Sequence, residues 1–163
     1  MPAAHAPREK TFLLARHEAR ALDWIARRVP ARVTPDHMTA LGVLAAFGTA
    51  AAYLLSNGDR AWLWAASGLL VVHWLGDSLD GTLARVRRAE RPTYGYYLDH
   101  LVDAVATACI GIGLGLSPHM LLAVGMAIVV AYLVLSINTY LETSVFGEFR
   151  LGYGRVGDRK SIV

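Results

Sequence analysis

Apolar residues occur along the chain in four long runs that are separated by short polar segments. The runs cover residues 38–55, 61–85, 94–116 and 120–141. A membrane-spanning helix needs about 20 mainly apolar residues, so each run is long enough to cross a bilayer. The pattern therefore predicts an all-α integral membrane protein with about four transmembrane helices.

The segment 12–29 has a different pattern, with apolar and basic residues on opposite sides of one helix. Its apolar side carries Phe12, Ala15, Ala19, Leu22, Ile25, Ala26 and Val29, and its other side carries Arg16, Arg20, Asp23 and Arg27. This pattern is typical of an amphipathic helix lying in the membrane interface. The alternative is a helix that packs on another protein domain.

The remaining segments complete a single membrane domain over residues 1–163. Residues 1–11 are polar and we expect them to be flexible, whereas residues 142–163 form a predicted cytoplasmic tail. The composition agrees with a membrane protein, because 55% of the residues are hydrophobic and the mean hydropathy is +0.37. The single cysteine, Cys109, excludes an intramolecular disulfide and is interpreted as a small buried apolar residue.

The distribution of basic residues predicts the orientation. Of the 16 Lys and Arg residues, all but Arg60 lie before the first run, in the 85–94 segment, or after the last run. Because cytoplasmic loops carry an excess of Lys and Arg, these three segments are predicted to face the cytoplasm. We therefore expect a multi-pass protein of the cell inner membrane with both termini cytoplasmic.

Four aspartates interrupt the second and third runs near that cytoplasmic side. Asp77 and Asp80 are three residues apart, and Asp99 and Asp103 are four apart, so each pair shares a helix face. The polar segment 86–94 folds the two helices back on each other, which brings the four carboxylates together. Ionisable side chains at membrane depth are costly and mark functional sites. Hard divalent cations would offset their repulsion, which indicates a two-metal site that grips a phosphate group.

These two segments resemble a known signature. Residues 77–85 read DSLDGTLAR and residues 95–103 read GYYLDHLVD, which matches DxxDGxxAR followed by GxxxDxxxD. This is similar to the motif of the CDP-alcohol phosphotransferase (CDP-alcohol phosphatidyltransferase) family. The segment 34–39, TPDHMT, resembles the TPNxxT sequence that begins the family's first membrane helix, although Asp36 stands where Asn is common.

The resemblance implies an enzyme of phospholipid biosynthesis. Such an enzyme transfers a substituted phosphate group from a CDP-linked donor, such as CDP-diacylglycerol, to the hydroxyl of a small alcohol and releases CMP. The family usually has six membrane helices, so the predicted four indicate a truncated chain, a shortened homologue or an inactive relative. The implied partners are the lipid donor, the alcohol acceptor and membrane lipids; a homodimer is expected from the resemblance only, and no nucleic acid is expected.

The resemblance also assigns roles to individual residues. The implied cofactor is Mg²⁺ or Mn²⁺, with two ions, and Asp103 is the implied general base. The implied metal ligands are Asp77, Asp80, Asp99 and Asp103, and the implied CDP-binding residues are Asp77, Gly81, Ala84, Arg85, Gly95 and Thr39.

Two other classes of protein also use acidic membrane helices. One is an intramembrane prenyltransferase, whose aspartate-rich motifs usually lack the DGxxAR sequence. The other is a small metal carrier or a structural membrane subunit. Metal-dependent binding of CDP would separate the three hypotheses.

Two weaker features concern packing. His73 is interpreted either as a hydrogen-bonded core histidine or as a residue that tunes Asp77. Gly111, Gly113 and Gly115 predict a close approach between helices.

Overall fold

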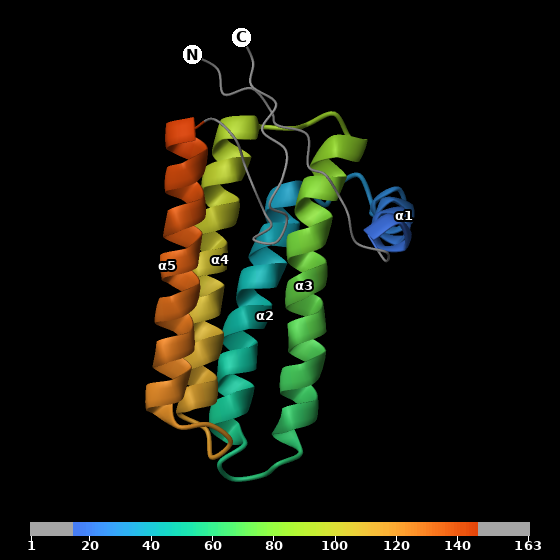
Figure 1. Ribbon diagram of the computed structural model, residues 1–163. Coiled ribbons are helices and arrows are strands. Elements are labelled where there is room, and N and C mark those ends of the chain that lie inside the picture. Colours follow the sequence, from blue (N-terminus) through green and yellow to red (C-terminus); the bar gives the residue numbers. More distant parts are fainter. Residues whose placement is uncertain (1–14, 147–163) are drawn as a thin grey trace. The chain divides into compact units, whose positions relative to one another are not determined.

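Five helices make up the part of the chain that the computed structural model describes, residues 15–146 (Figure 1). They are α1 (Ala15–Ala26), α2 (Pro35–Leu55), α3 (Trp62–Val86), α4 (Pro92–Gly115) and α5 (Leu122–Phe146). These residues contain no strand, so the all-α prediction is confirmed. The chain divides into two units, one of residues 10–133 and one of residues 1–9 with 134–163. The first unit contains α1 to α4 and the start of α5; the described part of the second is the remainder of α5.

The helix boundaries follow capping residues rather than the edges of the apolar runs. α2 begins at Pro35, three residues before the predicted run, because Thr34 caps the helix. The Thr34 hydroxyl accepts the backbone N–H of His37, and Nδ1 of His37 accepts the backbone N–H of Thr34 at 3.0 Å. Pro92 likewise starts α4, two residues before the predicted run.

The helix α5 continues through Phe146, five residues beyond the predicted membrane helix, so the predicted cytoplasmic tail begins as helix. Asn138 donates a side-chain hydrogen bond to Glu142, one turn later, at 3.2 Å. This contact supports the helix beyond the apolar run. Residues 147–163 and residues 1–14, which include the predicted flexible segment and the start of the predicted amphipathic helix, lie outside the described residues.

Three of the four predicted membrane helices are long and apolar enough to cross a bilayer. Among the described residues these are Pro35–Leu55, Pro92–Gly115 and Leu122–Glu142. The helix α3 has the required length, 25 residues, but is not one of the three. Polar residues near its C-terminal end, among them His73, Asp77 and Asp80, interrupt its apolar sequence. α3 packs along α2 (Figure 1).

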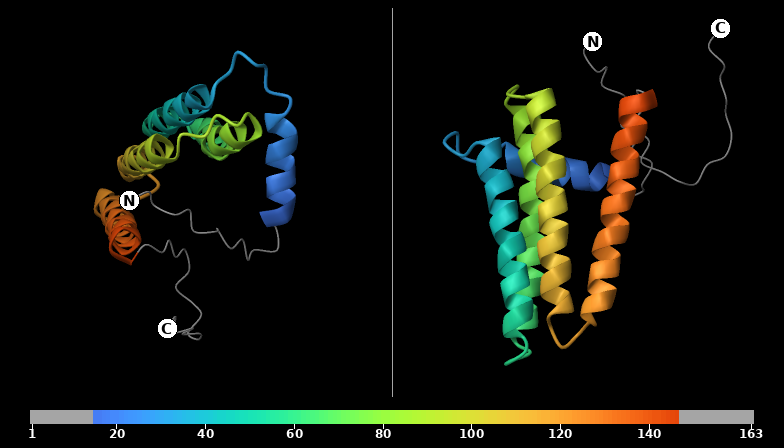
Figure 2. Two further views of the ribbon diagram at one scale, coloured as in Figure 1. Left: turned by 90° about the horizontal axis from the view of Figure 1, so that it is seen from above. Right: turned by 90° about the vertical axis from the view of Figure 1, so that its left-hand side faces the viewer.

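The helix α1 lies across the end of α3 at which the predicted site residues are found (Figure 2). Leu22 and Ala26 are buried and pack with Leu79 and Leu83 of α3. The opposite side of α1 is polar, and Arg27 forms an ion pair with Asp23 at 2.8 Å. The amphipathic pattern is therefore confirmed for residues 15–26, and its apolar face is directed at α3 of the same chain.

Small residues allow the central helices to approach closely. A Cβ atom added to Gly76 of α3 would lie 2.7 Å from the backbone nitrogen of Gly42 in α2. A Cβ atom on Gly113 of α4 would lie 2.6 Å from Cα of Ala50 in α2. The predicted packing role of the α4 glycines is thus confirmed. The His73 ring also belongs to this core, because its Nδ1 donates to the carbonyl oxygen of Gly42 at 2.9 Å.

Candidate active site

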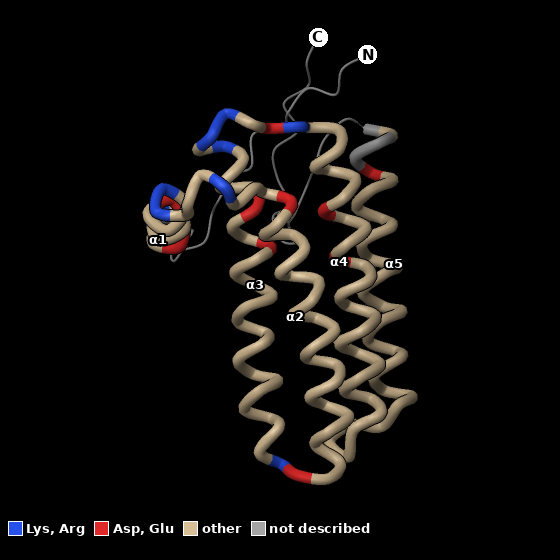
Figure 3. Tube along the Cα trace, turned by 180° about the vertical axis from the view of Figure 1, so that it is seen from behind, with Lys and Arg blue, Asp and Glu red and all other residues tan. Residues whose placement is uncertain are grey.

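A tight turn between α3 and α4 brings the two halves of the aspartate motif to the same end of the helices. Arg88 adopts a left-handed conformation with φ of 53°, and the N–H of Ala89 bonds to the carbonyl of Ala84 at 2.9 Å. This geometry ends a helix and reverses the chain. As a result, acidic residues of α3 and α4 gather near the end at which basic residues of the connecting segments also cluster (Figure 3).

The four aspartates occupy neighbouring, half-buried positions on α3 and α4. Asp103 is repelled electrostatically by Asp77, Asp99 and Asp80, and Asp80 is repelled by Asp77 and Asp99. The structure therefore brings together the four carboxylates that the sequence singled out. Because like charges held in one region destabilise each other, a bound cation or a proton would stabilise this arrangement.

Thr39 of α2 also belongs to this cluster, in a way that the sequence did not predict. Its hydroxyl donates to the Asp80 carboxylate at 2.7 Å, and it lies 3.3 Å from the carbonyl oxygen of Pro35. Asp80 also accepts the backbone N–H of Gly81. Thr39 was predicted to contact CDP, and this stays a prediction; in the structure its hydroxyl orients an aspartate. The sequence singled out Thr39 through the TPDHMT segment, which gave no indication of a contact with Asp80.

The remaining motif residues form an open surface beside the carboxylates. Gly81 and Gly95 are exposed, and a Cβ atom added at either would have no other atom within 4 Å. Arg85 is also exposed, and its guanidinium donates to the Thr82 hydroxyl at 3.0 Å. Ala84 is half-buried. Thus Gly81, Arg85 and Gly95 are accessible to a ligand, and neither glycine is required by helix packing.

The residue types of the cluster suit a divalent cation, although their side chains are not gathered around one point. Among the described residues, no group of three Asp, Glu, His or Cys side chains is arranged closely enough to hold one ion. Four carboxylates and a threonine hydroxyl nevertheless supply only oxygen ligands, which Mg²⁺ and Mn²⁺ prefer. Asp77, Asp80, Asp99 and Asp103 are therefore the residues able to hold such an ion.

Two arginines of the α3–α4 turn make contacts that sequence reasoning did not find. Arg87 donates hydrogen bonds to backbone carbonyls of the segment that connects α1 and α2, including that of Pro30 at 2.8 Å. Arg91 forms an ion pair with Asp36 at the start of α2. Both contacts join residues more than 50 positions apart, so no local pattern in the sequence indicated them.

Comparison with known proteins agrees with this geometry. The model of the CDP-alcohol phosphatidyltransferase family matches residues 32–152, which include α2, α3, α4 and all four aspartates. The phosphatidylinositol phosphate synthase of Cutibacterium acnes is 34% identical over 86 residues. That alignment covers 53% of this chain and 39% of the relative. The chain therefore belongs to the CDP-alcohol phosphatidyltransferase family.

Proposed function

We propose that the protein transfers a substituted phosphate group from CDP-diacylglycerol to the hydroxyl of a small alcohol, in a reaction that requires a divalent cation and releases CMP. One observation carries the proposal: four carboxylates from α3 and α4 lie together beside an open surface of motif residues. Clustered carboxylates suit a bound cation and the phosphate groups that it attracts.

The motif residues divide into groups with different tasks. Asp77, Asp80 and Asp99 would hold Mg²⁺ or Mn²⁺, with Asp103 close enough to share an ion. When bound, the cations would supply positive charge that stabilises the diphosphate and the CMP leaving group. Thr39 holds Asp80 in place through its hydrogen bond of 2.7 Å.

The open surface is the proposed site of the nucleotide. Gly81 has no side chain, so the CDP head group could approach the backbone of α3 there, and Gly95 offers the same access on α4. Arg85 is exposed one turn after Gly81 and would pair with a phosphate group. Ala84 would lie beside the nucleotide.

Asp103 is the proposed general base. The acceptor hydroxyl would form a bond to the phosphorus that carries the diacylglycerol group, while the bond from that phosphorus to the CMP oxygen breaks. The hydroxyl proton would pass to the Asp103 carboxylate, which contributes about 10²–10⁴ in rate. The site lies at the end of membrane helices, so acyl chains could stay in the bilayer while the CDP head group reaches water.

The relative suggests which acceptor to test first. It is a phosphatidylinositol phosphate synthase, so an inositol phosphate is our leading candidate for the alcohol. The clustered basic residues predict that this end faces the cytoplasm of a cell with the site in its inner membrane.

The experiment is CMP release by the purified protein in liposomes that contain CDP-diacylglycerol. Inositol phosphate, inositol, glycerol 3-phosphate and serine would be compared, each with Mg²⁺, Mn²⁺ or EDTA. We expect cation-dependent release with one acceptor. Release of no CMP with any acceptor, together with no binding of CDP, would contradict the proposal and favour a metal carrier or an inactive homologue.

A further inference from the structure

The connection between α1 and α2, residues 27–34, begins with a turn in which Arg28 and Val29 donate their backbone N–H groups to the carbonyl of Ile25. Pro30 and Pro35 lack an N–H, and each proline keeps the preceding residue out of the helical conformation. Within this connection, Val33 donates its backbone N–H to the carbonyl of Pro30 at 3.0 Å. Val29 and Val33 are half-buried, so a donor from elsewhere in the chain would satisfy their carbonyl groups.

Arg87 supplies that donor. Its two terminal guanidinium nitrogens donate to the carbonyls of Val29 at 3.1 Å, of Pro30 at 2.8 Å and of Val33, with a longer contact of 3.5 Å to Ala31. A guanidinium presents five N–H groups in a rigid planar fork, so one side chain can hold several carbonyls at once. We call this set of contacts the Arg87 clamp.

The position of Arg87 links the clamp to the aspartate cluster. Arg87 is the C-terminal capping residue of α3, and its backbone N–H bonds to the carbonyl of Leu83. Leu83 is fully buried and packs with Leu22 and Ala26 of α1. The clamp therefore fixes the chain immediately after α1 to the end of the helix that carries Asp80.

From the clamped segment the chain continues directly into the residue that orients Asp80. Val33 is followed by the Thr34 cap of α2, and Thr39 lies in the second turn of that helix. The Thr39 hydroxyl reaches Asp80 at 2.7 Å. Because α2 starts where the clamp ends, a shift of the connection would move Thr39 away from Asp80.

We infer that Arg87 is a positioning residue, which fixes the start of α2 on the end of α3 and thereby holds the Thr39–Asp80 pair in the geometry that binds a divalent cation and CDP. Arg87 lies two residues after the last residue of the DxxDGxxAR motif, and we give it no contact with substrate. The effect on CDP binding rests on the proposed function, whereas the effect on the start of α2 does not.

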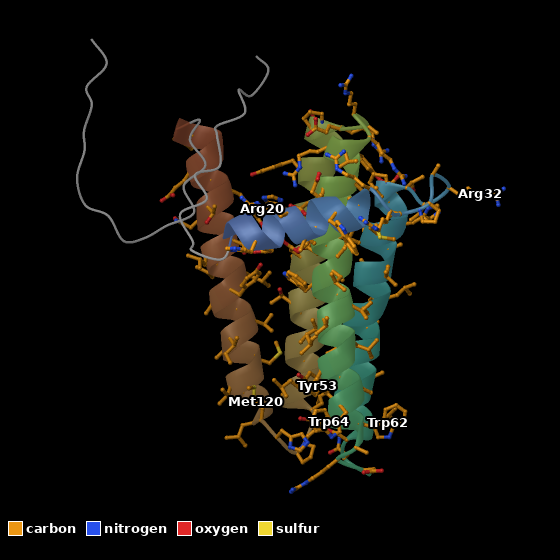
Figure 4. All side chains as sticks on the ribbon, turned by 90° about the vertical axis from the view of Figure 1, so that its right-hand side faces the viewer. Arg20, Arg32, Tyr53, Trp62, Trp64 and Met120 are labelled. Atoms are coloured by element: carbon orange, nitrogen blue, oxygen red, sulfur yellow. The ribbon has the colours of Figure 1, made fainter. Side chains whose placement is uncertain are left out.

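Two neighbouring arginines provide matched controls. Arg88 is exposed and shows no side-chain hydrogen bond or ion pair among the described residues. Arg32 lies within the connection itself, yet its side chain points away from the helices (Figure 4). Substitution of either residue removes the same charge from the same end of the protein without removing the clamp.

The test combines hydrogen exchange with CDP binding. Wild type, Arg87→Gln, Arg87→Lys, Arg88→Gln and Arg32→Gln would be purified in detergent, and retention of helical content would be checked by circular dichroism. Because several hydrogen bonds to a charged group are lost, we expect amide exchange across residues 31–39 to rise about tenfold or more in Arg87→Gln. The two control variants should match the wild type, and Arg87→Lys should lie between, since lysine keeps the charge and three donors.

The second measurement is calorimetric binding of CDP in the presence of Mg²⁺. Arg87→Gln should bind CDP about tenfold more weakly or worse, and added methylguanidinium should restore part of the affinity of an Arg87→Ala variant. A merely destabilised protein would not regain affinity from a guanidinium compound.

The outcomes are separable. Unchanged exchange across residues 31–39 in Arg87→Gln would overturn the inference, as would faster exchange with wild-type affinity for CDP. If the wild type itself binds no CDP, the proposed function fails, and the exchange data alone then decide whether Arg87 fixes the start of α2.

Discussion

Two glycines of α3, only five residues apart, have opposite surroundings. Gly76 lies at the crossing with α2, where a Cβ atom would come within 2.8 Å of the carbonyl oxygen of Met38 and 2.7 Å of the Gly42 nitrogen. Gly81, just beyond the first two aspartates, would accept a Cβ atom without any neighbour within 4 Å. One glycine is required by the packing of the helices, whereas nothing in the packing requires the other.

Residues needed for helix packing and residues of the candidate site therefore occupy different parts of the same helix. From Trp62 to Gly76, α3 is shaped by its contact with α2, and a glycine there allows two backbones to approach. From Asp77 to Arg85 the helix carries two aspartates that repel each other and Asp103, together with an exposed glycine, and the packing of the helices does not require that glycine. This contrast is the strongest structural argument that the motif of this chain is functional.

The largest expected effect comes from a substitution in the aspartate cluster. Asp103→Asn should reduce CMP release about 10²–10⁴-fold, because the acceptor hydroxyl loses its base. The same substitution should not lower the melting temperature in EDTA, since it removes a charge that its neighbours repel. CMP release and thermal unfolding in detergent are the two measurements.

A suitable control for this variant is Asp59→Asn at the opposite end of α3. Asp59 lies in the turn before α3 and accepts the backbone N–H of Ala61 at 2.8 Å, and asparagine keeps the accepting oxygen. The control should retain activity. Full activity of Asp103→Asn would contradict the role of Asp103 as the base.

The next effect concerns the packed region. Gly76→Ala should reduce the free energy of unfolding by about 1–3 kcal/mol, because the added methyl group overpacks the crossing of α2 and α3. Gly68→Ala is the matched control in the same helix, since a Cβ atom there would meet nothing within 4 Å. Equal stability of the two variants would show that the close approach at Gly76 is not required.

Gly81→Ala, in contrast to Gly76→Ala, should weaken ligand binding without lowering stability. Alanine favours a helix over glycine by about 0.5–1 kcal/mol, so the protein without ligand should become slightly more stable. Binding of CDP with Mg²⁺ should weaken about tenfold, which corresponds to about 1.4 kcal/mol. Titration calorimetry and thermal unfolding check the two halves of this prediction, and Gly68→Ala again serves as the control. Unaltered CDP affinity would mean that the nucleotide does not approach the backbone there.

The smallest effect is expected for the ion pair between Asp36 and Arg91. Both side chains are about half exposed, at 50% and 52%, and such pairs contribute about 0–1 kcal/mol. Asp36→Asn should therefore change stability by less than about 1 kcal/mol, and by less still at high salt. A larger loss in unfolding experiments would mean that this pair, like the Arg87 clamp, fixes the start of α2.

Much of this arrangement could be predicted from local sequence. The apolar runs predicted α2 to α5, because long uncharged segments have few alternatives to a helix in a bilayer. The aspartate spacing predicted one shared cluster, since the arginine- and proline-containing segment 86–94 had to reverse the chain. The amphipathic pattern predicted the buried face of α1.

What could not be predicted depends on contacts between distant residues. Thr39 was assigned to the nucleotide from the resemblance of its segment to a family sequence, and its contact with Asp80, 41 positions away in the chain, had no local signal. Arg87 was interpreted only as part of a polar turn, although it holds a segment more than 50 positions earlier.

The most direct test of the central claim is calorimetric binding of CDP to the purified protein, with Mg²⁺ and then with EDTA, in the wild type and in Asp80→Asn. If the open face of α3 and α4 is a cation-dependent nucleotide site, the wild type should bind CDP with Mg²⁺ and lose that binding in EDTA. Asp80→Asn should bind weakly or not at all in both. CDP binding that is equal with and without the cation, or that survives in Asp80→Asn, would contradict this account of the carboxylate cluster.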